Sequence, residues 1–317
     1  MQAAFLMLAL LGADEGIFEK GAKLEVLAGG GEGGEGPAWH PTLGVLSSGK
    51  GGICRFSLDG KASIHKKDAG TNGLLFDKEG RLIACEPVRR RVTRTDKAGK
   101  VTVLAETFGG KKFNQPNDVT VDAGGRVFFT DPVYGPRGLM ELKDEKGRFV
   151  EGVYRIDTGG EVTRVLGRDE VDRPNGILAS ADGKSLYVAD NNNDVGGTRK
   201  LWRFGLKGGV VDAKSRTLVY DWGKGRGPDG LKEDTKGRLF VAGGLNKPNP
   251  PAEPAKDVKG GIYVLSPAGE LLAFLPVPTD EVTNCAFGGK DRRDLYITGG
   301  GTLYRIRVKE PGRTVLP

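Results

Sequence analysis

A pattern that recurs six times along the chain constrains the fold more than any other feature of the sequence. Each copy has a polar lead-in, an apolar strand, a tight turn and a second strand rich in β-forming residues. The clearest copy spans residues 115–131, QPNDVTVDAGGRVFFTD, with its turn at residues 122–125. The six lead-ins contain Glu35, Asn72, Asn117, Asn175, Asp229 and Asn284. Repetition of this kind is typical of proteins built from stacked structural repeats.

The length of the repeat predicts an all-β fold, a six-bladed β-propeller with four strands in each blade. Each repeat spans roughly 37 to 58 residues and includes a fourth, outer strand in most copies. The sixth copy has no fourth strand after Val308, and we expect residues 23–28 to supply it and close the ring. The 52 glycines fit many short strands joined by turns rather than long helices. We therefore expect a single propeller domain over residues 23–310.

Antiparallel pairing within a blade predicts where the lead-ins lie. The start of the first strand and the end of the second strand fall on the same face of the disc. All six lead-ins should therefore converge at one mouth of the central channel. The loops over residues 133–152, 191–194 and 245–259 should rise from the same mouth. Long loops on one face of a rigid scaffold usually shape a binding site.

The lead-in side chains carry oxygen atoms of the kind that bind a hard divalent cation. Calcium takes six to eight oxygen ligands, whereas zinc usually prefers histidine or cysteine. Asn-Gly and Asp-Gly are common turn residues, but their recurrence at one point of every repeat favours a ligand ring. We expect one divalent cation, Ca²⁺ first, with Zn²⁺, Mn²⁺ and Mg²⁺ left open. The expected metal ligands are Glu35, Asn117, Asn175 and Asp229, and the expected channel-lining, substrate-binding residues include Asn72, Asn117 and Asn284.

The same segments carry a resemblance to a known family. GEGPAW, FNQPNDVTVDAGGRVFFTDPVYG, RPNGILASADGKSLYVAD, GPDGLKEDTKGRLFVAGG and TNCAFGGKDRRDLYIT together resemble the gluconolactonase, regucalcin and luciferin-regenerating enzyme family. The resemblance covers nearly the whole chain after Lys23. It implies metal-dependent hydrolysis of sugar lactones or related esters in a six-bladed propeller. By motif, it makes Glu35, Asn175 and Asp229 metal ligands and puts Asn117 beside the metal or the substrate.

One residue departs from the pattern of this family. Its animal lactonases have a substrate-contacting arginine two residues before the asparagine of the third motif, where this chain has Gln115. We include Gln115 among the substrate-binding residues, and the identity of the sugar acid stays open. Lys111, Lys112 and Arg173 are candidates to replace the missing cation.

The expected mechanism needs a carboxylate that accepts a proton. A bound cation polarises the lactone carbonyl and lowers the pKa of bound water, and Asp229 is the expected catalytic base. Asp118 and Asp131 either orient the site from behind the ligands or make strand-end hydrogen bonds. With two histidines and no nucleophile elbow, a Ser-His-Asp hydrolase is not indicated. Two alternatives remain, an organophosphate or other ester hydrolase and a non-enzymatic propeller that binds calcium or another ligand.

The net charge, the cysteines and the N-terminal residues limit the classes of protein to which this chain can belong. The net charge of +7 comes from scattered basic residues, without the contiguous stripe that nucleic-acid binding requires. Three cysteines without a CxxC motif argue against a disulfide framework and a thiolate zinc site. The apolar residues 3–12 are too short to span a membrane as a helix. They predict a signal peptide over residues 1–13 and a periplasmic or secreted protein, with the cytoplasm as the alternative. We expect a small-molecule substrate and a monomer or weak dimer.

Overall fold

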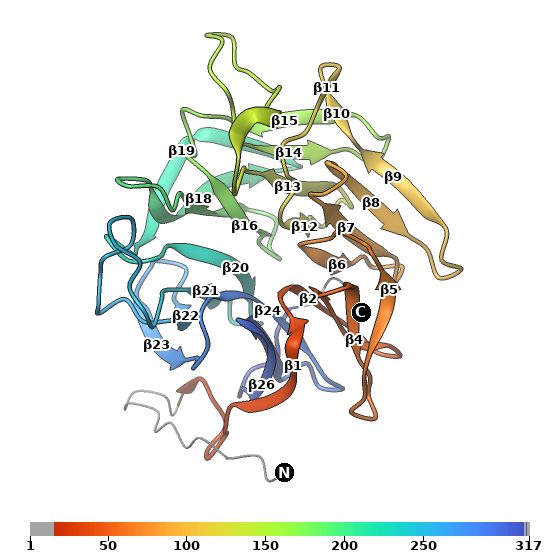
Figure 1. Cartoon of the computed structure of the whole chain (residues 1–317), viewed down its shortest axis with the longest axis vertical. Helices are drawn as coiled ribbons and strands as arrows, with labels where there is room; N and C mark the ends of the chain where they lie inside the picture. The colour runs from red at the N-terminus through yellow and green to blue at the C-terminus, as the bar shows by residue number, and fades with distance from the viewer. Residues whose placement is uncertain (1–15, 314, 316–317) are drawn as a thin grey trace.

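Six four-stranded antiparallel sheets stand around a central axis in the computed structural model (Figure 1). The structure describes residues 16–313 and residue 315. The prediction of a six-bladed β-propeller is confirmed. The expected signal peptide over residues 1–13 lies outside the described residues.

Each blade is a meander whose strands are hydrogen-bonded to their neighbours in chain order, the innermost strand first. Blades 1 and 2 are β2 (Glu35–His40), β3 (Gly44–Gly49), β4 (Gly52–Phe56), β5 (Ala62–Lys67), and β6 (Leu74–Phe76), β7 (Leu82–Glu86), β8 (Arg91–Thr95), β9 (Val101–Ala105). Blades 3 and 4 are β12 (Val119–Val121), β13 (Val127–Asp131), β14 (Gly152–Ile156), β15 (Val162–Leu166), and β16 (Pro174–Ala179), β17 (Ser185–Asn191), β18 (Arg199–Lys207), β19 (Val210–Asp221). Blade 5 is β20 (Pro228–Glu233), β21 (Leu239–Gly243), β22 (Gly261–Leu265), β23 (Leu271–Pro276).

Blade 6 joins the two ends of the chain. It consists of β24 (Val282–Gly288), β25 (Asp294–Gly299) and β26 (Gly301–Arg307), with β1 (Glu25–Gly33) as its outer strand. In the antiparallel register between β1 and β26, Glu25 lies opposite Arg305. The predicted closure by an N-terminal strand is therefore confirmed, and the strand continues beyond residue 28 to Gly33.

The hydrophobic core lies between neighbouring blades. Each sheet is covered on both faces by the sheets of the two adjacent blades. In one cluster, Ile83 and Cys85 of blade 2 pack against Phe129 and Tyr154 of blade 3. All five residues of β7 and of β13 are buried, including the polar Glu86, Thr130 and Asp131 at their ends. The three cysteines are buried and none forms a disulfide.

Two small elements outside the four-stranded sheets were not predicted. A hairpin of β10 (Thr107–Phe108) and β11 (Lys111–Lys112) precedes blade 3, and a 3-10 helix, η2 (Arg137–Leu139), lies in the long loop after β13. Among the described residues, no helix has the length and apolar character needed to cross a membrane.

Candidate active site

The lead-ins of neighbouring blades touch one another at one mouth of the channel. The main-chain N–H of Gly73 donates to the oxygen of Asn117 at 2.7 Å, which joins blades 2 and 3. The Thr130 hydroxyl donates to the main-chain oxygen of Asn175 at 2.6 Å, which joins blades 3 and 4. The Thr283 hydroxyl donates to the oxygen of Gly34 at 2.9 Å and closes the circle between blades 6 and 1. These hydrogen bonds at the mouth thus join three of the six pairs of neighbouring blades.

Glycines behind the lead-in residues make this close approach possible. A Cβ on Gly36 would overlap the main-chain oxygen of Asn72, and one on Gly230 would overlap the side chain of Asn284. A Cβ on Gly73 would lie 2.6 Å from the main-chain oxygen of Asn117. The Asn-Gly and Asp-Gly pairs are therefore required by packing between blades and are more than turn residues.

Two carboxylates, Glu35 of blade 1 and Asp229 of blade 5, face the channel mouth. Burial and the charge of Asp229 raise the pKa of Glu35 well above its usual range. Burial raises the pKa of Asp229 to about 7, although Arg226 opposes the shift. One Asp229 oxygen, Oδ1, is buried without a hydrogen-bond partner among the described residues, whereas Glu35 Oε2 accepts the N–H of Gly36 at 2.8 Å. The two acids repel each other electrostatically, as carboxylates do when no cation lies between them.

Four asparagine amides complete the set of predicted oxygen donors. Asn175 is 4% exposed, and its side-chain N–H donates to the Tyr134 hydroxyl at 2.9 Å. Asn117 is buried at the start of blade 3. Asn72 Oδ1 is buried without a hydrogen-bond partner among the described residues, while Asn284 Oδ1 accepts the N–H of Cys285 at 2.9 Å. The amide oxygen of Asn284 is therefore already engaged within its own lead-in.

An arginine that the sequence reasoning missed lies beside Asp229. Arg226 is buried, and its guanidinium lies 2.8 Å from Glu281 Oε1 and 3.7 Å from Asp229 Oδ2. A third carboxylate, Glu253 of the loop over residues 245–259, lies 3.7 Å from the same guanidinium. The signal was present in GRGPDG, where Arg226 stands three residues before the expected ligand.

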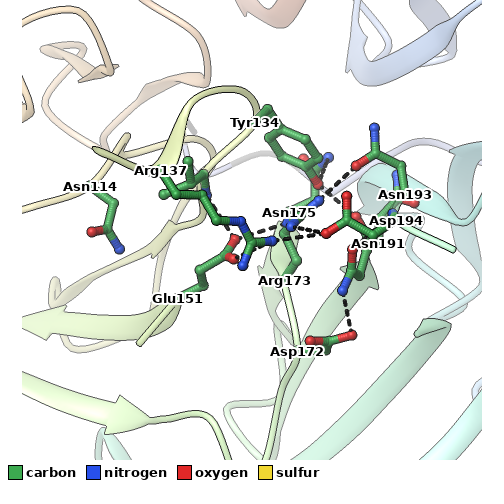
Figure 2. A network of polar contacts seen from close by, with 12 residues as sticks. Asn114, Tyr134, Arg137, Glu151, Asp172, Arg173, Asn175, Asn191, Asn193 and Asp194 are labelled. Carbon is green, nitrogen blue, oxygen red and sulfur yellow. Dashed lines mark hydrogen bonds and ion pairs between the residues drawn. The ribbon is translucent and has the colours of Figure 1, made fainter. Parts of the chain in front are cut away.

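The candidates for a replacement cation are engaged elsewhere or lie on the surface. Arg173 is buried and binds Glu151 at 3.0 Å, Asn193 Oδ1 at 2.7 Å and Asp194 at 2.9 Å (Figure 2). Lys111 and Lys112 are exposed on β11. The structure thus assigns Arg173 to the network of the loops and leaves Arg226 as the cation beside Asp229.

Gln115 anchors the loop that follows β13. Its side-chain oxygen accepts the main-chain N–H of Tyr134 at 2.9 Å. The Tyr134 hydroxyl in turn reaches Asn175 and Asn191, and its ring lies beside the guanidinium of Arg173 (Figure 2). A substrate contact by Gln115 stays a prediction, and the contact seen here is with the loop.

The two aspartates expected behind the ligands make hydrogen bonds within and between blades. Asp118 accepts the N–H of Val119 at 2.9 Å and that of Ile177, in the next blade, at 3.4 Å. Asp131 is fully buried, and its Oδ2 accepts the N–H of Asn114 at 2.8 Å. Both side chains therefore hold the backbone beneath the mouth, and an orienting role toward substrate stays a prediction.

The predicted ligands and a large cavity lie at opposite ends of the channel. A cavity of about 790 Å³ is lined by the turns between first and second strands, including Asp122, Ser180 and Glu233. These turns are on the far face from the lead-ins.

A metal ion bound by the lead-in residues would need amide oxygens among its ligands as well as carboxylates. Within residues 16–313 and 315, no three side chains of histidine, cysteine, aspartate or glutamate are clustered so that they could hold an ion. Glu35 and Asp229 would have to be joined by amide oxygens, Asn175 first, and by water. Such an all-oxygen set suits calcium, which accepts neutral oxygens and flexible geometry.

The chain is similar to known proteins over most of its length. The family model described as SMP-30/Gluconolactonase/LRE-like region matches residues 33–301. A gluconolactonase of Zymomonas mobilis is 28% identical over 324 aligned residues, which cover 94% of this chain and 85% of that protein. A pentonolactonase of Haloferax volcanii is 29% identical over 277 residues, covering 84% of this chain and 81% of that protein.

A solved structure agrees with these sequence comparisons. A gluconolactonase of Xanthomonas campestris superposes with a TM-score of 0.73 and 27% sequence identity, covering 91% of this chain and 90% of that chain. The similarity extends over all six blades rather than a single motif.

Proposed function

The chain belongs to the SMP-30/gluconolactonase/LRE-like family, and we propose that it hydrolyses sugar lactones with one divalent cation bound among its lead-in residues. Relatives named gluconolactonase and pentonolactonase support the lactone as the class of substrate. Calcium is the cation we propose, from the chemistry of the oxygen donors.

The observation that carries the proposal is the unpartnered buried oxygen of Asp229. A buried carboxylate oxygen without a hydrogen bond is costly unless a ligand completes its surroundings. Glu35 raises the cost, because its own carboxylate faces the same space. A divalent cation would neutralise both acids and give Asp229 Oδ1 a partner. Glu35, Asn175 and Asp229 would hold it, with Asn117 beside the cation or the substrate.

The residues at the mouth then have different roles in ring opening. When bound, the cation would polarise the lactone carbonyl and acidify a neighbouring water. Asp229 accepts the proton of the water that attacks the carbonyl carbon. The bond from that carbon to the ring oxygen breaks, and the ring oxygen takes the proton held by Asp229 to give the hydroxy acid and restore the carboxylate. Arg226 holds Asp229 in place from the other side of the carboxylate.

Hydrolysis of glucono-1,5-lactone, followed with a pH indicator, tests the proposal. The protein is stripped of metal and assayed with calcium, zinc, manganese or magnesium added back, against the spontaneous rate without enzyme. Restored turnover supports the lactonase and ranks the cations. A folded protein that binds calcium and leaves the lactone untouched would instead point to another ester or to a binding role. A phosphotriester assayed in parallel separates the organophosphate alternative.

Export from the cytoplasm is a separate proposal that rests on the apolar residues 3–12. N-terminal sequencing of the native protein tests it. A chain that begins near Asp14 supports cleavage of a signal peptide, and a chain that begins at Met1 contradicts it.

A further inference from the structure

We propose that Tyr134 is a positioning residue that fixes the side-chain amide of Asn175 with its oxygen available to the cation. The inference rests on the proposed function, because it takes Asn175 as a ligand. Tyr134 comes from the loop after β13, whereas Asn175 opens blade 4 (Figure 2). The two are 41 residues apart and meet only through the fold.

The hydrogen bonds of the Tyr134 hydroxyl determine which end of the amide faces it. A phenol has one hydrogen to donate. That hydrogen goes to the main-chain oxygen of Asn191, 3.0 Å away, because a carbonyl oxygen can only accept. The group that approaches the hydroxyl from Asn175 must therefore be a donor. It is the amide N–H, at 2.9 Å, and the amide oxygen is turned away from the tyrosine.

This orientation matters because the two ends of an amide are opposite in their chemistry. Calcium binds the oxygen, and a rotated amide would present N–H groups to it instead. The main chain of Asn175 is already fixed, since its oxygen accepts the Thr130 hydroxyl and Gly176 packs on blade 5. The side-chain torsion is the freedom that remains, and the Tyr134 hydroxyl removes it.

Tyr134 is itself held from two directions. Gln115 accepts its main-chain N–H, and the guanidinium of Arg173 lies 5.6 Å from the centre of its ring. Arg173 is fixed in turn by Glu151 and Asp194. The residue at position 115 therefore acts on the site through Tyr134. This gives Gln115 a role without the cationic contact that the animal lactonases make at that position.

Calcium affinity measured by calorimetry on the metal-stripped full chain tests the inference. Residues that orient a ligand from behind typically change metal affinity by 10- to 100-fold when they are replaced. We expect Tyr134→Phe to weaken calcium binding by about tenfold or more in the wild-type background. The matched control is Tyr263→Phe, which also removes a hydroxyl that donates to a main-chain oxygen, that of Lys259 at 2.8 Å, and it should bind calcium as the wild type does.

A second background separates orientation of the amide from a general loss of structure. In Asn175→Asp both side-chain ends are oxygens, so no rotation can remove a ligand atom. Adding Tyr134→Phe to Asn175→Asp should therefore change calcium affinity by less than about threefold, a small effect beside the tenfold change expected of orientation. An equal loss in both backgrounds, or no loss in either, overturns the inference.

The outcomes of these measurements distinguish a failure of this inference from a failure of the proposed function. If the wild type binds calcium and hydrolyses lactone while Tyr134→Phe does both equally well, only the role of Tyr134 falls. If the wild type binds no calcium but hydrolyses lactone with another cation, this inference falls and the lactonase proposal stands; if it does neither, both fall. Should Tyr134→Phe fail to fold, Gln115→Met removes the acceptor that anchors Tyr134 and is compared in the same two backgrounds, with the same outcomes.

Discussion

A side chain on Gly176 would overlap the main-chain oxygen of Asp229. Gly176 belongs to the lead-in of blade 4, and Asp229 opens blade 5. The carboxylate at the centre of the proposed chemistry is therefore positioned by the backbone of the neighbouring blade. Adding one methyl group at Gly176 should therefore displace groups at the site.

We expect Gly176→Ala to destabilise the protein and to weaken the site together. Overpacking of a close contact typically costs about 1–3 kcal/mol, and here the strain falls on Asp229. Calcium affinity and kcat/KM for lactone should both fall by about tenfold or more, since a 1 Å misplacement can cost far more than that. Urea unfolding and calorimetry measure the two effects. Gly159→Ala, at a turn with open space around it, should change stability by less than about 0.5 kcal/mol.

Equal behaviour of these two variants would contradict the packing argument. It would mean that the ring can relax around an extra methyl group, so that the recurrent glycines serve only the turns.

Arg226→Met should be strongly destabilising. The guanidinium is the cation that Asp229 and Glu281 share, and Glu253 also lies near it. Removing one partner of a buried ion pair typically costs about 3–5 kcal/mol. Loss of Arg226 would leave Asp229 and Glu253 buried without this cation, whereas Glu281 is half exposed. Urea unfolding at pH 8, above the pKa of about 7 that burial gives Asp229, measures the loss.

Lys61→Met provides the comparison for Arg226. Lys61 pairs with Asp59 at 3.1 Å, but both side chains are largely exposed, so its loss should cost no more than about 1 kcal/mol. A similar small cost for Arg226→Met would show that the buried carboxylates do not depend on this arginine.

The sequence alone was sufficient to predict the structural features that follow from the repeat. Six copies of one pattern predicted the blades, and the missing strand after Val308 predicted the closure by the N-terminal strand. The lead-in positions of Glu35, Asn175 and Asp229 were predicted because a shared register puts equivalent residues at one end of the channel.

The interactions that were missed depend on loops that do not repeat. Tyr134 reaches Asn175 only because Gln115 and Arg173 hold the loop after β13 in place. Arg226 meets Glu281 from the following blade and Glu253 from the loop over residues 245–259. Neither pairing follows a period, so sequence spacing alone could not have found it.

Asp131 should make the stability of the protein depend on pH. Burial raises the pKa of Asp131 well above its usual range, and Oδ1 is buried without a hydrogen-bond partner among the described residues. Below about pH 4 the side chain is protonated in both states, and its contribution to stability is complete. As the pH rises further, the unfolded chain releases this proton while the native chain keeps it. The free energy of unfolding therefore falls as the pH rises, until the pH reaches the pKa of the folded state. The fall is at most about 1.4 kcal/mol per pH unit.

Asp131→Asn removes this titration. The difference in unfolding free energy between wild type and variant should shift in favour of the variant as the pH rises from 5 to 8, with urea unfolding as the measurement. Parallel profiles for the two proteins would mean that Asp131 is ionised in the native state despite its burial.

Asp229→Asn should abolish hydrolysis even when the cation is supplied in excess. The substitution keeps the size of the side chain but removes its ability to accept a proton from water. Loss of a catalytic base typically lowers the rate by about 10²- to 10⁴-fold. Because the amide is also a poorer ligand than the carboxylate, kcat has to be measured at saturating calcium. This condition separates the chemical role of Asp229 from its role in binding the cation.

Asp96→Asn is the control for this substitution. Asp96 accepts the N–H groups of Ala98 and Lys100 in a turn of blade 2 outside the ring, so its replacement should leave kcat unchanged. If Asp229→Asn needs more calcium but then reaches the wild-type kcat, Asp229 is a ligand only. In that case Glu35, the other carboxylate at the mouth, becomes the candidate base, and Glu35→Gln at saturating calcium is the measurement that assigns it.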